Sequence, residues 1–232
     1  MNSSNPQTRK PARRADAPEI HCLSSDLKRL RGLQRELLRA SGEKQQKLQA
    51  DLAALIERSR AAVQERRAKL PKPEFQADLP VNERRADIAE LIAKNQVVIV
   101  CGETGSGKTT QLPKICLEIG RGVHGLIGHT QPRRLAARNI ARYLAQQLGE
   151  EVGQQVGYRV RGESRVSAAT RLEIVTEGIL TRMIQADPEL PGVSLLIFDE
   201  FHERSLHADL ALALSIESRS ALRPDLRLLV MS

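Results

Sequence analysis

The chain has 232 residues, of which 41% are hydrophobic and 28% are charged, a composition typical of soluble globular proteins. No apolar run approaches the roughly 18 residues of a membrane span, and the N-terminus lacks the apolar stretch of a secretory signal. The three cysteines, Cys22, Cys101 and Cys116, are far apart, which argues against a disulfide framework or a zinc site. We therefore expect reduced thiols in a cytoplasmic protein with no membrane partner.

The net charge of +8 is unevenly distributed along the chain. Residues 1–80 carry 17 Lys and Arg against 10 Asp and Glu, whereas residues 81–232 carry 19 against 18. A basic arm on a near-neutral domain attracts polyanions, most often nucleic acid. A solvated helical surface that is rich in arginine explains the same charge equally well, and the charge alone does not decide.

The first part of the chain predicts a tail and a pair of helices. Residues 1–23 are polar and contain several prolines, which predicts a disordered basic tail. Leucines spaced three and four residues apart then predict two amphipathic helices, over about 27–38 and 48–63. We expect these to form a helical hairpin within an extension over residues 24–74. These helices would pack on each other or on something outside this sequence. We expect them either to contact RNA or to have no activity of their own, and the sequence leaves both alternatives open.

Residues 75–232 form the second predicted unit, after a linker at Pro71–Pro73. Short apolar runs alternate there with helical stretches, which predicts an α/β domain around a mostly parallel sheet and leaves the strand order open. The expected strands are 96–101, 126–129, 156–160, 172–175, 194–198 and 226–231. The expected helices are 112–119, 132–148, 178–185 and 206–220.

The strongest motif is the P-loop GETGSGKT, which follows the apolar run QVVIVC. Glycines at 102, 105 and 107 let backbone N–H groups surround phosphate oxygens, and a helix that starts near Gly107 turns its positive end toward the same anion. Lys108 would neutralise the β and γ phosphates, and the Thr109 hydroxyl would bind Mg²⁺. The predicted ATP-binding residues are Gly102, Glu103, Thr104, Gly105, Ser106, Gly107, Lys108, Thr109 and Thr110.

A second motif ends the apolar run Leu195–Phe198 with two acids, Asp199 and Glu200. At the carboxyl end of a parallel strand such side chains face the P-loop. Asp199 can hold Mg²⁺ through a water, and Glu200 can lie at the metal and take the proton from an attacking water. An acid pair after a strand is as often a helix N-terminal pair. The P-loop about 90 residues upstream favours catalysis here.

The segments GETGSGKTTQLPK, TQPRRLAARNIA, TEGIL and DEFHERSLHADL together resemble the first RecA-like lobe of DEAH-box ATP-dependent RNA helicases, with wording closest to the bacterial HrpA type. The resemblance covers about residues 75–232. It implies a RecA-like P-loop NTPase fold and an enzyme that couples ATP hydrolysis to 3′-to-5′ movement along single-stranded RNA. The sequence stops at Ser232, in what would be a Ser-Ala-Thr motif, so by this resemblance we expect the second lobe of such an enzyme to be missing. We expect this lobe alone to be poorly active.

The resemblance also implies which residues contact RNA. Arg133 and Arg134 of TQPRR and Thr176 of TEGIL would lie along the RNA backbone. Arg161 would contribute a contact at a strand edge, although the aromatic residue that often follows this arginine in relatives is absent. Arginine suits bidentate phosphate contact, which gives sequence-tolerant binding. Single-stranded or structured RNA is the expected partner, with the ribosome as a further candidate.

Three further positions are read from the resemblance. His202 would couple the nucleotide state to the rest of the machine, as a fourth catalytic residue beside Lys108, Asp199 and Glu200. Phe201 stands where the family motif has alanine, so a large ring must find space after the catalytic strand. Tyr143 aligns with an arginine that stacks on adenine in relatives, and tyrosine can also stack.

Two other functions fit the same residues. One is an NTP-dependent switch that clamps RNA or ribosomes without unwinding. The other is a nonenzymatic product that acts through its basic helices. An ATPase assay with and without RNA, together with a strand-separation assay, would distinguish the first from a helicase, and removing residues 1–75 would test the second.

Overall fold

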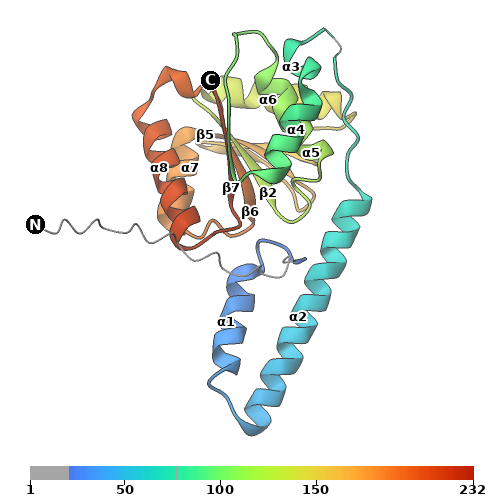
Figure 1. The fold of residues 1–232 in the computed structure, drawn as a ribbon, viewed down its shortest axis with the longest axis vertical. Helices are drawn as coiled ribbons and strands as arrows, with labels where there is room; N and C mark the ends of the chain where they lie inside the picture. Colours follow the sequence, from blue (N-terminus) through green and yellow to red (C-terminus); the bar gives the residue numbers. More distant parts are fainter. Residues whose placement is uncertain (1–20, 77) are drawn as a thin grey trace, which may run out of the picture.

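The computed structural model describes residues 21–76 and 78–232. They form an α/β body from which a helical hairpin projects (Figure 1). Residues 1–20, on which most of the predicted tail falls, lie outside the described residues. None of the helices in the described part of the chain combines the length and apolar character that a membrane crossing requires.

A seven-stranded sheet lies at the centre of the described residues, in the order β1-β7-β6-β2-β5-β3-β4. Every neighbouring pair is parallel except β3 and β4, so the prediction of a mostly parallel sheet is confirmed. All six predicted strands are present. The strands are β1 (Val97–Val100), β2 (Leu126–Gln131), β3 (Val156–Val160), β4 (Glu163–Arg165), β5 (Leu172–Thr176), β6 (Val193–Phe198) and β7 (Arg227–Met231).

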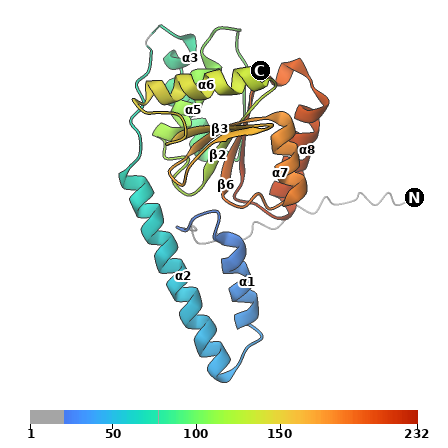
Figure 2. The ribbon, with the colours of Figure 1, turned by 180° about the vertical axis from the view of Figure 1, so that it is seen from behind.

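Helices cover both faces of this sheet (Figures 1 and 2). Along β6, Leu195 and Ile197 join the core that contains α4, α5 and α6, whereas Leu196 and Phe198 join the core that contains α7 and α8. Successive strand residues point to opposite faces, so a strand covered on both sides must be apolar throughout. The helices of the body are α3 (Pro80–Glu83), α4 (Arg85–Lys94), α5 (Lys108–Glu118), α6 (Arg134–Gln147), α7 (Glu177–Ala186), the 3₁₀ helix η1 (Phe201–Glu203) and α8 (Leu206–Ala221).

The hairpin consists of α1 (Leu27–Leu37) and α2 (Gly42–Ala68). Leu27 and Leu30 of α1 pack against Leu55 of α2 in a separate small core, so the two predicted stripes do face each other. The tail boundary predicted at residue 23 is too late. Cys22 is buried in this core, and the backbone N–H of Leu23 donates to the Ser59 hydroxyl at 2.8 Å.

Arginines attach the hairpin to the amino edge of the sheet, where the parallel strands begin. Near the end of α2, Arg66 donates to the carbonyl oxygens of Gly122 at 2.8 Å and Val123 at 3.0 Å, just before β2. Arg171, directly before β5, returns a bond to the carbonyl of Arg66 at 2.6 Å. Charged donors thus satisfy carbonyl groups that the sheet leaves unpaired at this edge.

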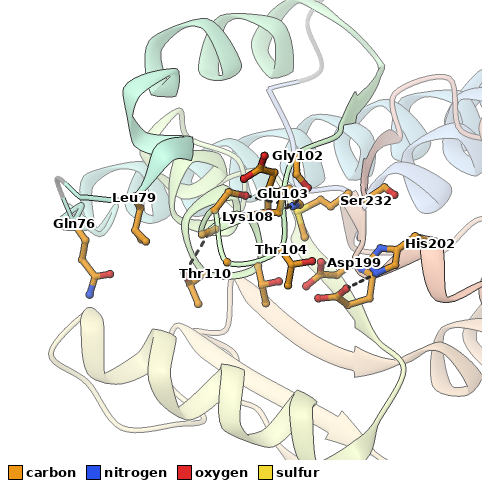
Figure 3. Close-up of a pocket in the computed structure, with 16 residues that line it drawn as sticks. Gln76, Leu79, Gly102, Glu103, Thr104, Lys108, Thr110, Asp199, His202 and Ser232 are labelled. Atoms are coloured by element: carbon orange, nitrogen blue, oxygen red, sulfur yellow. Dashed lines mark hydrogen bonds and ion pairs between the residues drawn. The ribbon is translucent and has the colours of Figure 1, made fainter.

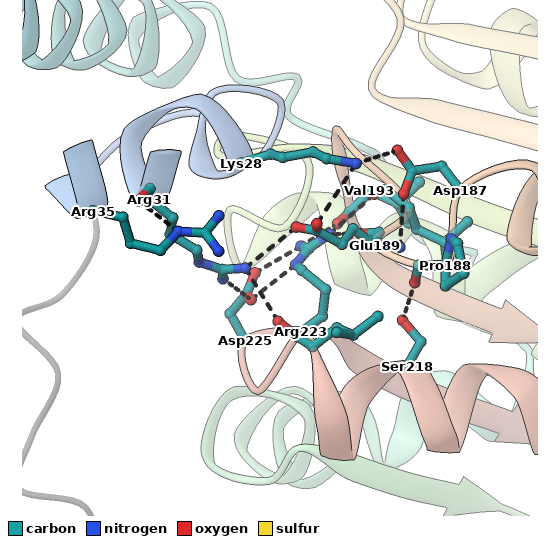
Figure 4. A network of polar contacts seen from close by, with 12 residues as sticks. Lys28, Arg31, Arg35, Asp187, Pro188, Glu189, Val193, Ser218, Arg223 and Asp225 are labelled. Carbon is teal, nitrogen blue, oxygen red and sulfur yellow. Dashed lines mark hydrogen bonds and ion pairs between the residues drawn. The ribbon is translucent and has the colours of Figure 1, made fainter. Parts of the chain in front are cut away.

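Ion pairs extend this contact along α1 (Figure 4). Lys28 Nζ lies 2.9 Å from Asp187 Oδ2, and Arg31 lies 3.5 Å from Glu189 and 3.7 Å from Asp225. These acids precede β6 and β7. Part of the basic charge of the N-terminal third is therefore used inside the molecule, on the sheet's amino edge.

Arg223 holds the same acidic loops from within. Its side chain is 2% exposed and donates to both carboxylate oxygens of Asp225, at 2.9 and 2.7 Å. It also donates to the carbonyls of Glu189 at 2.6 Å and Val193 at 2.7 Å. The buried guanidinium is fully paired, so the acids stay in place for α1 to contact.

Candidate nucleotide site at the carboxyl edge of the sheet

The chemically distinctive segments lie at the opposite edge, where the parallel strands end. The strand order fixes their sequence in space, with β6 next to β2. One half of the edge carries the P-loop and the acid pair, and the other half carries the residues predicted to contact RNA. From one side to the other the edge presents Gly102 after β1, Ser232 after β7, Asp199 after β6, Gln131 at the end of β2, Thr176 at the end of β5 and Arg161 after β3.

The P-loop has the curled backbone that its glycines permit. Gly105 and Gly107 have φ values of 83° and 93°, a region that costs glycine little. A Cβ on Gly107 would also meet the Leu79 side chain at 3.0 Å. Helix α5 begins at Lys108, whose amine donates to the carbonyls of Gly102 at 2.5 Å and Glu103 at 2.9 Å. The loop therefore wraps around the lysine amine with the helix N-terminus beside it.

A pocket of about 490 Å³ opens over this loop (Figure 3), a size ordinary for small-molecule sites. All nine P-loop residues predicted to bind nucleotide line it, together with both acids and the predicted coupling histidine. The lining residues are Gln76, Leu79, Gly102, Glu103, Thr104, Gly105, Ser106, Gly107, Lys108, Thr109, Thr110, Asp199, Glu200, His202, Met231 and Ser232.

Asp199 is buried at 3% exposure and has partners on both carboxylate oxygens. Oδ1 accepts from the backbone N–H of Glu200 at 2.9 Å, and Oδ2 accepts from Gln131 Nε2 at 2.5 Å and lies 3.1 Å from His129 Nε2. Burial by itself raises the pKa of Asp199. The hydrogen bonds from His129, Thr109 and Gln131 and the charge of His129 outweigh it, so the pKa lies below its ordinary value. Asp199 is thus held as an oriented carboxylate.

Glu200 has a left-handed backbone, with φ 50° and ψ 33°. This conformation is uncommon for a residue other than glycine, and strain of this kind concentrates at functional sites. It turns the chain sharply after β6, so that Glu200 and His202 both reach the pocket. His202 Nε2 lies 3.3 Å from Glu200 Oε2. The two side chains can therefore orient each other.

The four residues predicted to contact RNA follow three adjacent strands. Arg133, Arg134 and Arg161 are exposed, and Thr176 is half-buried at the start of α7. Arg133 Nη2 lies 3.5 Å from Glu203 Oε1 of η1, next to the acid pair. The basic half of the edge thus adjoins the pocket through β2.

Comparison with known families decides which class this arrangement represents. The family model described as DEAD/DEAH box helicase matches residues 83–232. The chain belongs to the DEAD/DEAH box helicase family. The P-loop and the acid pair of the pocket both fall within the matched residues.

Individual helicases of this family are similar over much of the chain. The ATP-dependent RNA helicase HrpA homolog of Haemophilus influenzae is 46% identical over 193 residues, which cover 83% of this chain and 15% of that helicase. HrpA of Escherichia coli is 44% identical over 81% of this chain and 14% of its own length. The crystal structure of the E. coli DExH-box NTPase HrpB superposes with a TM-score of 0.62 and 48% identity over 68% of this chain and 19% of that one. The chain thus spans about 15% of the length of its HrpA relatives.

Two departures from the DEAH pattern have structural outcomes in this helicase lobe. The ring of Phe201 packs against the core between the sheet and α7 and α8, so the large side chain does find space. Tyr143 is not among the pocket residues. It packs against the opposite core, and its hydroxyl accepts from Gln76 Nε2 at 3.1 Å. The predicted adenine contact is therefore at most indirect, through Gln76, which does line the pocket.

Sequence reasoning missed several residues of the site. Gln76 and Leu79 line the pocket. Buried Lys114 of α5 donates to the carbonyl of Glu74 at 2.6 Å, which fixes the segment that precedes α3 over α5. His129 and Gln131 were missed although a signal existed. They are polar residues inside the buried strand β2, and buried polar side chains need specific partners.

Proposed function

We propose that this chain is the ATP-binding lobe of an ATP-dependent RNA helicase that moves 3′-to-5′ along single-stranded RNA. The observation that carries the proposal is the meeting of the P-loop after β1 and the acid pair after β6 in one pocket. The names of the HrpA and HrpB relatives, which are ATP-dependent RNA helicases, support the same assignment. We also propose that the protein acts in the cytoplasm, which its three free thiols support.

The phosphates of ATP would occupy the P-loop. Backbone N–H groups of the loop and the N-terminus of α5 would bind them, and Lys108 would exchange its carbonyl partners for phosphate oxygens. The donor set of Thr109, Asp199 and Glu200 fits Mg²⁺, which prefers a few oxygen ligands beside phosphate and water. Bound Mg²⁺ would supply stabilisation of the negative charge that develops on the phosphates.

Glu200 would take the proton of the attacking water. Its carboxylate lines the pocket, where it would accept a proton from a water beside the terminal phosphate. His202 lies 3.3 Å from this carboxylate. It would orient the Glu200 carboxylate and respond when Glu200 takes the proton from water. Asp199, already ionised and fixed by its partners, would keep its charge throughout the cycle.

RNA would lie along the other half of the carboxyl edge. Arg133 and Arg134 after β2 and Arg161 after β3 are exposed on either side of β5, which ends at Thr176, and arginines on both sides of one strand end suit a row of phosphates. Contacts of this kind tolerate any sequence, which suits a motor. We propose that translocation also needs a second lobe, since an arginine from another lobe or protein contributes about 10³–10⁵ in rate to related phosphoryl transfers. We also propose the ribosome as a further partner.

The test uses a protein that joins this lobe to a second one. We expect ATP hydrolysis stimulated by single-stranded RNA, and separation of a duplex with a 3′ overhang. Lys108→Ala should abolish hydrolysis, and Glu200→Gln should bind ATP without turning it over. Lys94→Ala, which removes an exposed lysine paired with Glu90, is the matched control and should retain wild-type activity. Wild-type turnover in either site variant would overturn the assigned roles.

A further inference from the structure

The two halves of the carboxyl edge meet at one buried side chain, Gln131. It is the last residue of β2, its side chain is 2% exposed, and it lies two residues before Arg133. Its Cα is the register partner of Thr176 on β5. Gln131 is therefore flanked along the chain and across the sheet by residues predicted to contact RNA.

The side chain of Gln131 points the other way, into the nucleotide half. Its Nε2 donates to Asp199 Oδ2 at 2.5 Å, a charge-assisted bond of the strong class. Asp199 lines the same pocket as Thr109 in the first turn of α5. The Gln131–Asp199 contact thus connects the end of β2 with the pocket over the P-loop.

His129 shares this contact without sharing the position. Its Nε2 lies 3.1 Å from the same oxygen of Asp199, but its Cα partners are Ile174 and Ile197 in the middle of the sheet. His129 thus lies in mid-strand between two buried neighbours, 3.2 Å from Gln131 Nε2 through its own Nε2. Gln131 is the member of this cluster that stands at the strand end, where the chain leaves the sheet.

We propose that Gln131 is the positioning residue that couples RNA binding to nucleotide binding in this lobe. This inference rests on the proposed function. Contacts of RNA with Arg133 and Thr176 would fix the end of β2, and the Gln131 amide would then hold the Asp199 carboxylate in the orientation that suits Mg²⁺-bound ATP. The effect is reciprocal: if bound RNA raises the affinity for ATP by some factor, bound ATP raises the affinity for RNA by the same factor.

The test measures this coupling directly at equilibrium. The dissociation constant of a fluorescent, non-hydrolysable ATP analogue with Mg²⁺ is measured with and without saturating single-stranded oligouridine, and the ratio is the coupling factor. We expect a factor of about fivefold or more for the wild-type chain, at the lower end of common allosteric couplings. Gln131→Met, which has nearly the same shape but no donor, should bring it close to one. The affinity measured without RNA should fall by a smaller factor.

Two further variants separate coupling from folding. Gln131→Asn keeps the polar group but is one methylene too short for the 2.5 Å contact, so it should also lose the coupling. Glu173→Gln weakens another buried bond of the same sheet, 2.7 Å to Arg159, without touching Asp199, and should keep it. Both variants are compared with wild type by thermal unfolding.

Three outcomes would overturn the inference while leaving the proposed function intact. The first is a wild-type chain that binds nucleotide and RNA independently. The second is a Gln131→Met variant with an undiminished coupling factor. The third is a Gln131→Met variant whose nucleotide affinity without RNA falls by the same factor as its coupling. A wild-type chain that binds no Mg²⁺-nucleotide would instead overturn the proposed function itself.

Discussion

The two edges of the same sheet use charged side chains in opposite ways. At the amino edge, Arg66, Arg171 and Arg223 each donate to several backbone carbonyls. At the carboxyl edge, Lys108 contacts loop carbonyls beside a pocket of about 490 Å³, and Glu200 faces the same space. The first set closes a surface, and the second leaves groups that a ligand can use. Charge alone therefore does not identify a binding site, and the open pocket beside the charged groups does.

The largest effect should come from the carboxyl edge. Asp199→Asn removes the fixed negative charge and should weaken Mg²⁺-dependent nucleotide binding on the order of tenfold to a hundredfold. Titration of a fluorescent ATP analogue with Mg²⁺, and again with EDTA, measures the effect. Binding in EDTA should change little, because only the metal depends on the charge. An equal loss in both conditions would mean that Asp199 merely supports the P-loop.

At the amino edge the same kind of change should affect stability and leave the ligand alone. Arg66→Met removes bonds from a half-buried guanidinium to the carbonyls of Gly122 and Val123, which should cost about 2 kcal/mol of unfolding free energy. Urea unfolding measures this. Arg58→Met, at an exposed position of the same helix, should be nearly neutral. A loss of nucleotide affinity in Arg66→Met would show that the two edges are not independent.

The contrast also explains what could be predicted from the sequence. The strands were predictable because helices cover both faces of the sheet, so the last four residues of β6 and of β7 are all apolar. The P-loop was predictable because its glycines, lysine and threonine are adjacent in the chain. The short strand β4 was missed because Glu163–Arg165 is polar and partly exposed, so it has no apolar pattern.

Contacts that depend on strand order were beyond the sequence. Gln131 and Asp199 are 68 residues apart and meet only because β2 lies next to β6. The same holds for Arg66, whose carbonyl partners on the body lie 56 to 104 residues away. The sequence shows the charge of Arg66. It does not show whether this charge contacts a polyanion, water or the protein's own backbone.

The pH dependence of the amino edge sharpens the comparison further. Burial raises the pKa of Asp225, but the hydrogen bonds and charge of Arg223 outweigh it and leave the pKa below its ordinary value of 3.8. This carboxylate therefore stabilises the fold fully above its unfolded pKa, and the contribution is lost as the pH falls through the lower folded value. Asp225→Asn should cost about 1 kcal/mol at pH 7. Urea unfolding should give the same cost at pH 5 and a smaller one below pH of about 4, and a cost that grew on acidification would contradict the assignment.

The smallest effect, measured by thiol labelling, reports on both edges in one experiment. Cys101 is exposed directly before Gly102, whereas Cys22 is buried beneath the hairpin and burial raises the pKa of Cys116 to about 12. At pH 8 a maleimide should label Cys101 first, and Mg²⁺-ATP should slow it a few-fold by covering the P-loop. Arg66→Met should instead speed labelling of Cys22 and leave the ATP protection of Cys101 unchanged. Peptide mapping by mass spectrometry separates the three sites. If ATP protected Cys22, or the Arg66 change exposed Cys101, the division between a closed amino edge and an open carboxyl edge would be wrong.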